Sequence, residues 1–180
     1  MQPPHYSRDT STYDSGAENL RLTSQYRNRH HDSSRSRYCQ ACNGWRFASM
    51  TSIALVCGAF HRTEVQQMIE HATEEAKTHN LKIVEIVWIP GSMEAPLATA
   101  RLLEDEDIAG VACLGIIEKG ETQHGLAMGQ AVIKSLIDLQ LGYDKPIGLG
   151  IIGPGAEPQH IAPRLEPHAR SAIAAIAQML

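Results

Sequence analysis

SIALVCGA, at residues 52–59, is an unbroken apolar run of strand length. Such a run is typical of a strand that is buried on both faces of a parallel sheet. Three more strands are predicted along the chain: KIVEIVWI at 82–89, GVACLGII at 110–117 and PIGLGII at 146–152. The sequence therefore predicts a four-stranded sheet.

Helices are predicted between these strands and at the end of the chain. They run from Thr63 to about Asn80, from Pro96 to Leu103, from about Thr122 to Gln140 and from Pro167 to Leu180. Strands that alternate with helices of this length pair in parallel through right-handed crossovers. The predicted fold class is α/β, a three-layer α/β/α sandwich around a four-stranded parallel sheet.

Two of these helices carry clear local signals. Thr63 and Gln66 have the spacing of a capping box, which predicts that the first helix starts there. One face of the first helix is apolar at helical spacing, through Val65, Met68, Ile69, Ala72 and Ala76. In the third helix, the residues expected to point inward are Met128, Val132, Leu136 and Leu139.

Residues 1–49 are rich in Ser, Arg, Tyr and His and show no helical or strand period. Such a segment cannot bury enough apolar surface to offset its ordering entropy, so we expect a disordered extension. It is either sequence upstream of a natural start at Met50 or a targeting segment. Its lone C-x-x-C, Cys39 and Cys42, has only His30 and His31 nearby. A zinc site needs four ligands, and no metal is expected.

Charge and cysteine content narrow the class of protein. Seven arginines and four acidic residues precede Met50, a net charge of +3, whereas nine basic and sixteen acidic residues follow, a net charge of −7. An acidic domain lacks the basic face that nucleic acid or a membrane surface requires, so neither partner is expected. No apolar run is long enough to span a bilayer. Cys57 and Cys113 fall in predicted buried strands, which fits a reducing, cytoplasmic location.

Ligands of parallel α/β sheets bind beyond the carboxyl ends of the strands, so residues after each strand are site candidates. Phe60 follows the first strand, as either a core residue that caps it or a flat platform for a planar heterocycle. Glu94 follows the second strand. It is either a helix N-terminal acid favoured by the dipole or an acceptor of hydrogen bonds from ligand hydroxyls, assisted by the backbone amides of Ser92 and Met93.

The third and fourth strands are followed by candidates for phosphate binding. Gly120 permits a tight turn, Thr122 can cap the next helix, and the free N–H groups there suit a phosphate at Glu121 and Thr122. His124 lies in the same first turn, as either a structural histidine or a proton-transfer group, and its neighbours favour proton transfer. Arg164 is either an exposed helix residue or a guanidinium that grips phosphate.

Four segments together resemble the lumazine synthases, in particular the archaeal type: AFHR at 59–62, PGSMEAP at 90–96, LGIIEKGETQH at 114–124 and YDKPIGLGIIGPG at 143–155. They occur in the family's order and spacing over essentially all of residues 50–180. The resemblance implies a flavodoxin-like fold and a transferase of riboflavin biosynthesis. It would condense 5-amino-6-(D-ribitylamino)uracil with 3,4-dihydroxy-2-butanone 4-phosphate, giving 6,7-dimethyl-8-ribityllumazine and phosphate, with no metal or cofactor.

The resemblance also implies a role for each candidate residue. Those that contact substrate would be Phe60, Ile116, Ile117 and Glu118 at the uracil, Ser92, Met93 and Glu94 at the ribityl chain, and Glu121 and Thr122 at the phosphate. His124 would shuttle protons. Leu149 and Arg164 would come from the neighbouring subunit of a homopentamer, which in this family sometimes assembles into a sixty-subunit shell.

Several positions depart from the usual pattern of the family. They are His61 for Asn, Met93 for an aromatic residue, Glu118 for an apolar residue, Leu149 for the bacterial Phe, and Ala169 for Lys, although Arg170 adjoins it. Pro163 also precedes Arg164, so the helix that carries this arginine must be short or kinked.

Three alternative functions remain open at this point. The departures motivate a non-catalytic homologue that binds a ribityl-pyrimidine or forms a shell. An archaeal-type riboflavin synthase is disfavoured by GETQH at 120–124. A flavodoxin-like module would need a phosphate loop after the first strand, where this chain has Phe60, His61 and Arg62.

Overall fold

The computed structural model of the chain describes residues 50–180, and the predictions made for residues 1–49 lie outside this range. Its four strands are β1 (Thr51–Gly58), β2 (Leu81–Ile89), β3 (Gly110–Glu118) and β4 (Ile147–Ala156). They pair in parallel in the order β2-β1-β3-β4. The predicted sheet is confirmed. Three of the strands match to within one residue, and β4 continues four residues beyond its predicted end.

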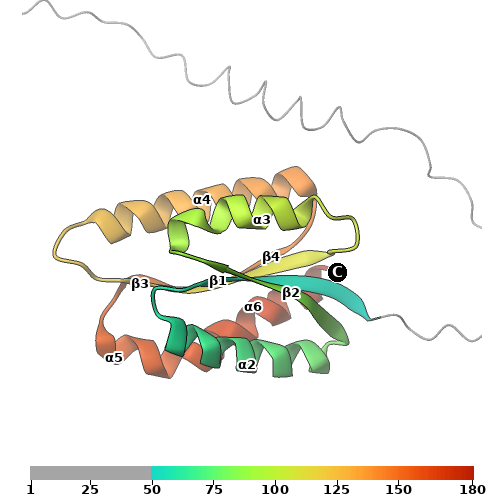
Figure 1. Ribbon diagram of the computed structural model, residues 1–180, viewed down its shortest axis with the longest axis horizontal. Coiled ribbons are helices and arrows are strands. Elements are labelled where there is room, and N and C mark those ends of the chain that lie inside the picture. Colours follow the sequence, from blue (N-terminus) through green and yellow to red (C-terminus); the bar gives the residue numbers. More distant parts are fainter. Residues whose placement is uncertain (1–49) are drawn as a thin grey trace, which may run out of the picture. The chain divides into compact units, whose positions relative to one another are not determined.

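The helices cover both faces of the sheet. The long ones are α2 (Arg62–Thr78), α3 (Ala95–Leu103), α4 (His124–Tyr143) and α6 (Leu165–Met179), and the short ones are η1 (Ser92–Glu94), α5 (Pro158–Ile161) and η2 (Ala162–Arg164). Helices α3 and α4 lie on one face, and α2, α5 and α6 lie on the other (Figure 1). The predicted three-layer sandwich is confirmed.

The central strands β1 and β3 are buried on both faces, which is why they read as unbroken apolar runs. Alternate residues of a strand point to opposite faces. In β1, Ile53, Leu55 and Cys57 therefore pack in the core that includes α2 and α6, whereas Ala54 and Val56 pack in the core with α3 and α4. This arrangement brings the carboxyl ends of all four strands to one edge of the sheet.

Helix α2 confirms the predicted apolar face but not the predicted start. Its buried residues are Val65, Met68, Ile69, Ala72 and Ala76, the same five that the spacing indicated. The N-cap, however, is His61, which makes no side-chain capping bond, so Thr63 and Gln66 do not form a capping box. The helix ends before Asn80, whose φ of 56° is a left-handed conformation that suits asparagine. This confirms the predicted stop.

Helices α4 and α6 begin at residues other than those predicted. Helix α4 starts at His124, two residues late, with Gln123 as its N-cap; Val132 and Leu136 are buried, whereas Met128 and Leu139 are only partly buried. Helix α6 starts two residues before Pro167. Proline is tolerated there because the N–H groups of the first turn have no helical partner in any case.

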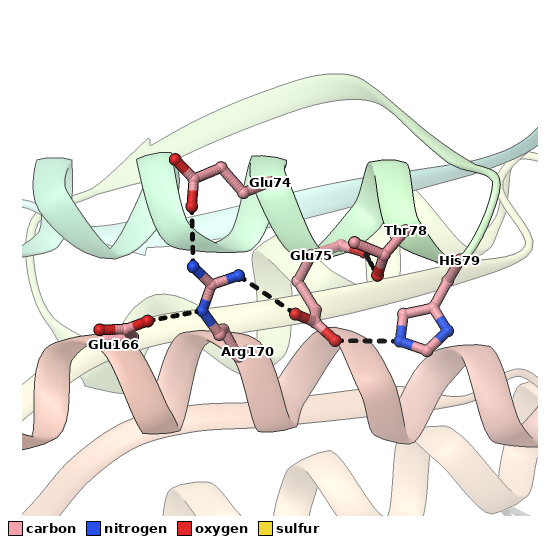
Figure 2. Close-up of polar contacts among 6 residues, drawn as sticks. All are labelled: Glu74, Glu75, Thr78, His79, Glu166 and Arg170. Atoms are coloured by element: carbon pink, nitrogen blue, oxygen red, sulfur yellow. Dashed lines mark hydrogen bonds and ion pairs between the residues drawn. The ribbon is translucent and has the colours of Figure 1, made fainter.

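Arg170 links α6 to α2 through two carboxylates of α2 and also pairs with a third carboxylate on its own helix (Figure 2). Its Nη2 lies 2.7 Å from Glu74, its Nη1 3.2 Å from Glu75 and its Nε 2.8 Å from Glu166, all measured to carboxylate oxygens. Glu75 also contacts Nε2 of His79 at 3.0 Å. A planar guanidinium that binds several carboxylates at once contributes more to stability than an isolated surface ion pair does. Arg170 is therefore a clamp between two helices of the same layer.

We expect Arg170→Ala to lower the melting temperature by a few degrees at neutral pH. Hydrogen bonding to Arg170 lowers the pKa of Glu166 below its usual value. Stability linked to a lowered carboxyl pKa is present above the unfolded value and is lost as pH falls through the folded one. The difference from the parent should therefore shrink in acid, as thermal melts at several pH values would show.

Lys134→Ala is the matched control for this prediction. Lys134 pairs with Asp138 at 2.6 Å within α4 alone, and both side chains are largely exposed. Its removal should change the melting temperature less than the removal of Arg170 does. Equal effects would mean that Arg170 contributes no more than an ordinary surface pair.

Candidate functional site

A cavity of about 440 Å³ opens at the carboxyl edge of the sheet. Segments that follow β1, β2 and β3 contribute to its wall, as expected for a parallel sheet. Eight of the predicted site residues line it: Phe60, Ser92, Met93, Ile116, Ile117, Glu118, Thr122 and His124. The sequence places these residues far apart, and the fold brings them to one cavity.

Phe60 is 75% exposed, which rules out the interpretation that it is a core residue capping β1. Its ring stands edge-on to the imidazole of His61, with 5.1 Å between the ring centroids. Met93, which also lines the cavity, is 72% exposed. The backbone N–H of Ala59 donates to the carbonyl oxygen of Ile89 at 2.8 Å, which joins the chain after β1 to the end of β2. Phe60 and Met93 thus follow two strand ends that are held together.

His124 is placed by the close approach of α4 to the end of β3. A Cβ atom on Gly125 would lie 2.9 Å from the carbonyl oxygen of Glu118, so only glycine lets the first turn pack here. The N–H of His124 lies 3.4 Å from the hydroxyl oxygen of Thr122, a weak contact that falls short of the predicted cap. Within residues 50–180, the His124 side chain has no polar partner and lines the cavity.

Glu94 and Glu121 do not line this cavity. The Glu94 carboxylate accepts a hydrogen bond from the backbone N–H of Gly91 at 3.0 Å, so its observed contact is that of an acid at a helix start. Glu121 lies in a second cavity of about 490 Å³, which shares Glu118, Gly120, Thr122 and Gly125 with the first. The predicted phosphate loop is thus the boundary between the two cavities.

Leu149 and Arg164 lie outside both cavities of the single chain. Leu149 is 43% exposed on β4. Arg164 is at the end of η2, where its Nη1 donates to the carbonyl oxygen of His160 at 3.0 Å. The segments that precede α6 are a four-residue helix and a three-residue turn, as expected from Pro163. The contribution of these residues from a neighbouring subunit stays a prediction.

Lys119 and His61 are two neighbours of the site that the sequence did not single out as functional. Lys119 reaches the second cavity, where its Nζ lies 2.7 Å from the carboxylate of Glu157. This hydrogen bond raises the pKa of Lys119 and lowers that of Glu157. His61 lines the first cavity beside Phe60. Its position directly after the aromatic residue at the end of β1 was the feature of the sequence that could have indicated a role for His61 in the site.

The two cysteines of the described range are free and buried. Burial raises the pKa of Cys57 to about 12 and that of Cys113 to about 11. Thiols with such values stay protonated at neutral pH and do not act as nucleophiles. Among residues 50–180 there is also no cluster of three or more His, Cys, Asp or Glu side chains that could hold a metal ion, and no helix long and apolar enough to cross a membrane.

The sheet and its edge cavity define a class, the α/β proteins that bind small molecules beyond the carboxyl ends of parallel strands. Within this class, the family model described as 6,7-dimethyl-8-ribityllumazine synthase matches residues 50–180. The chain belongs to this family. Its reaction is therefore the lumazine synthase reaction of riboflavin biosynthesis, and the predicted family and enzyme activity are confirmed.

Three curated relatives agree with this assignment, and each of them carries the name 6,7-dimethyl-8-ribityllumazine synthase. The Staphylothermus marinus protein is 37% identical over 131 residues, which cover 73% of this chain and 87% of the relative. The Methanopyrus kandleri protein is 40% identical over 128 residues, which cover 71% of this chain and 90% of the relative. The Metallosphaera sedula protein is 34% identical over 131 residues, which cover 73% of this chain and 87% of the relative.

Proposed function

We propose that the edge cavity is where 5-amino-6-(D-ribitylamino)uracil binds and reacts with 3,4-dihydroxy-2-butanone 4-phosphate. The observation that carries the proposal is the convergence of eight predicted site residues on one cavity. The uracil ring stacks on the exposed face of Phe60, and its edge lies along the end of β3, at 116–118. The ribityl chain extends toward Ser92 and Met93, with Glu94 beside them.

The reaction needs few catalytic groups. An amine condenses with a ketone, phosphate leaves, and ring closure expels water. Both substrates are already reactive, so holding them together in the cavity supplies most of the acceleration. His124, exposed in the cavity wall and without a competing partner in the described range, moves protons as general acid and base.

The phosphate binds where the two cavities meet. Helix α4 has twenty residues, and the free N–H groups of its first turn, together with those at Glu121 and Thr122, form an anion site. Nζ of Lys119 lies 2.7 Å from the carboxylate of Glu157, so its charge is already paired. A further cation is needed to close on the phosphate, and Arg164 of a neighbouring subunit fills that role.

A homopentamer with its sites between subunits accounts for several exposed apolar residues. Phe60 and Met93 in the cavity wall, and Leu97 and Leu149 outside it, are all more than 40% exposed, and exposed apolar surface of this kind suits contact between subunits. Assembly also brings Leu149 and Arg164 to the cavity of the next subunit. Light scattering on the purified protein distinguishes a pentamer from a sixty-subunit shell.

We expect Arg164→Ala to raise KM for the phosphate-bearing substrate about tenfold, the loss of a charge-assisted hydrogen bond. KM for the pyrimidine should change little, because the proposed role of Arg164 is at the phosphate alone. Steady-state kinetics with each substrate varied in turn would measure both. Arg101→Ala, on the exposed side of α3, is the control and should behave as the parent.

The direct test of the proposed function is to mix both substrates with the protein and record lumazine absorbance. Product formation by the parent that Phe60→Ala slows, through loss of the ring in the cavity wall, supports the proposal. Binding of the pyrimidine without turnover would instead indicate a non-catalytic homologue. Incubation with lumazine alone tests the remaining alternative, because only a riboflavin synthase would consume it.

A further inference from the structure

His61 and Glu118 contact each other in the wall of the edge cavity. Nε2 of His61 lies 2.9 Å from Oε1 of Glu118, and both residues line the cavity. The register of the sheet makes this contact. Cys57 on β1 is opposite Leu114 on β3, and His61 and Glu118 each follow four residues later. Two positions that depart separately from the family pattern thus contact each other.

The imidazole of His61 is held from three directions. Its side chain is only 15% exposed, and Nδ1 lies 3.9 Å from a carboxylate oxygen of Glu64, whereas Nε2 faces Glu118. The ring of Phe60 packs edge-on against it. Nε2 is buried and has the distance of an ion pair to Glu118 without the alignment of a hydrogen bond. Both ring nitrogens therefore face carboxylates.

Glu118 has one oxygen available to a ligand. Its side chain is 44% exposed, and Oε1 faces His61. The other oxygen, Oε2, has no partner among residues 50–180. A carboxylate only accepts hydrogen bonds, so the open oxygen selects a donor. Phe60 packs against His61, and both residues line the same cavity as Glu118, so this acceptor and the platform on which a ring would stack belong to one cavity wall.

We propose that Glu118 determines specificity for the pyrimidine substrate by accepting a hydrogen bond from an N–H group of its ring, and that His61 is a positioning residue that fixes the Glu118 carboxylate. The proposal rests on the proposed function, since it assigns the ring to this end of the cavity. A ring edge that presents an N–H group gains a charge-assisted bond. An edge that presents only carbonyl oxygens is repelled by the carboxylate.

The test compares Glu118→Ile with the parent in equilibrium binding of 5-amino-6-(D-ribitylamino)uracil, followed by the change in fluorescence or heat. We expect Glu118→Ile to weaken binding about tenfold, or about 1.4 kcal/mol, with kcat within a few fold of the parent. A ring-N-methylated analogue should bind the parent more weakly than the unmethylated ring does, and Glu118→Ile should lose this discrimination. Unchanged affinity and unchanged discrimination would overturn the proposal.

A double-mutant cycle tests the positioning role of His61. His61→Ala should weaken binding several-fold in the parent but add little in the Glu118→Ile background, whereas a purely structural role would give additive losses and lower thermal stability. Glu70→Gln is the control, because Glu70 is exposed on α2 and lines neither cavity. It should stay within about twofold of the parent.

The two levels of the proposal fail in different ways. If the edge cavity is not the substrate site, Phe60→Ala binds the pyrimidine as the parent does, because its ring also lines that cavity. If only the role of Glu118 is wrong, Phe60→Ala binds the pyrimidine more weakly and Glu118→Ile binds it as the parent does.

Discussion

Replacing His124 with alanine is expected to lower kcat about a hundredfold, at the lower end of the range for general acid–base groups. The loss is limited because both substrates are intrinsically reactive and remain held together in the cavity. Affinity for the pyrimidine should stay largely intact, since the ring and the ribityl chain are bound by other residues. Steady-state kinetics and equilibrium binding measure the two effects separately.

His79→Ala is the control for loss of a histidine. His79 caps α2 and pairs with Glu75, outside both cavities (Figure 2). The kcat of His79→Ala should equal that of the parent. If His124→Ala turned over at the rate of the parent, His124 would have no part in proton transfer, although the pyrimidine site could still be correct.

The second large effect is expected at Gly148 of β4. A Cβ atom there would lie 2.2 Å from the carbonyl oxygen and 2.8 Å from the carbonyl carbon of Ala172, both backbone atoms of α6. Neither atom can move without shifting the helix, which packs Ala169 and Ile173 into the core. Gly148→Val should therefore cost about 4 kcal/mol of stability or prevent folding, as overpacking against backbone does in its severe cases.

Urea unfolding would measure this change, with Gly142→Ala as the matched control. A Cβ atom on Gly142 meets nothing within 4 Å, and the residue lies in the last turn of α4. Alanine is the better helix former, so this variant should be as stable as the parent or more stable by about 0.5–1 kcal/mol. Similar stabilities for the Gly148 and Gly142 variants would mean that α6 does not pack so closely on β4.

The helices and strands were predictable from sequence wherever burial imposes a regular pattern of apolar residues. The strands at 52–59 and 110–117 are buried on both faces, and the five apolar residues of α2 all face the core. Helix starts were less predictable, because they depend on local backbone geometry. The Thr63 capping box did not form, and α4 begins at His124, two residues after the expected Thr122.

The site was predictable to the extent that it lies directly after strands. Phe60 and His124 line the cavity because parallel strands end at one edge. The contact of His61 with Glu118 was not predictable, because it requires the register of β1 on β3. Arg164 is away from the cavities of its own chain, and no pattern within one chain specifies what a second subunit would contribute.

A crystal structure with 5-amino-6-(D-ribitylamino)uracil bound tests most directly whether loops from separate strands build one pyrimidine site. We expect the ring against Phe60, its edge at residues 116–118, the ribityl chain toward Ser92, and His124 facing the amine that reacts. A ring bound away from the carboxyl edge of the sheet, or bound there with Phe60 and His124 facing elsewhere, would contradict the proposed site.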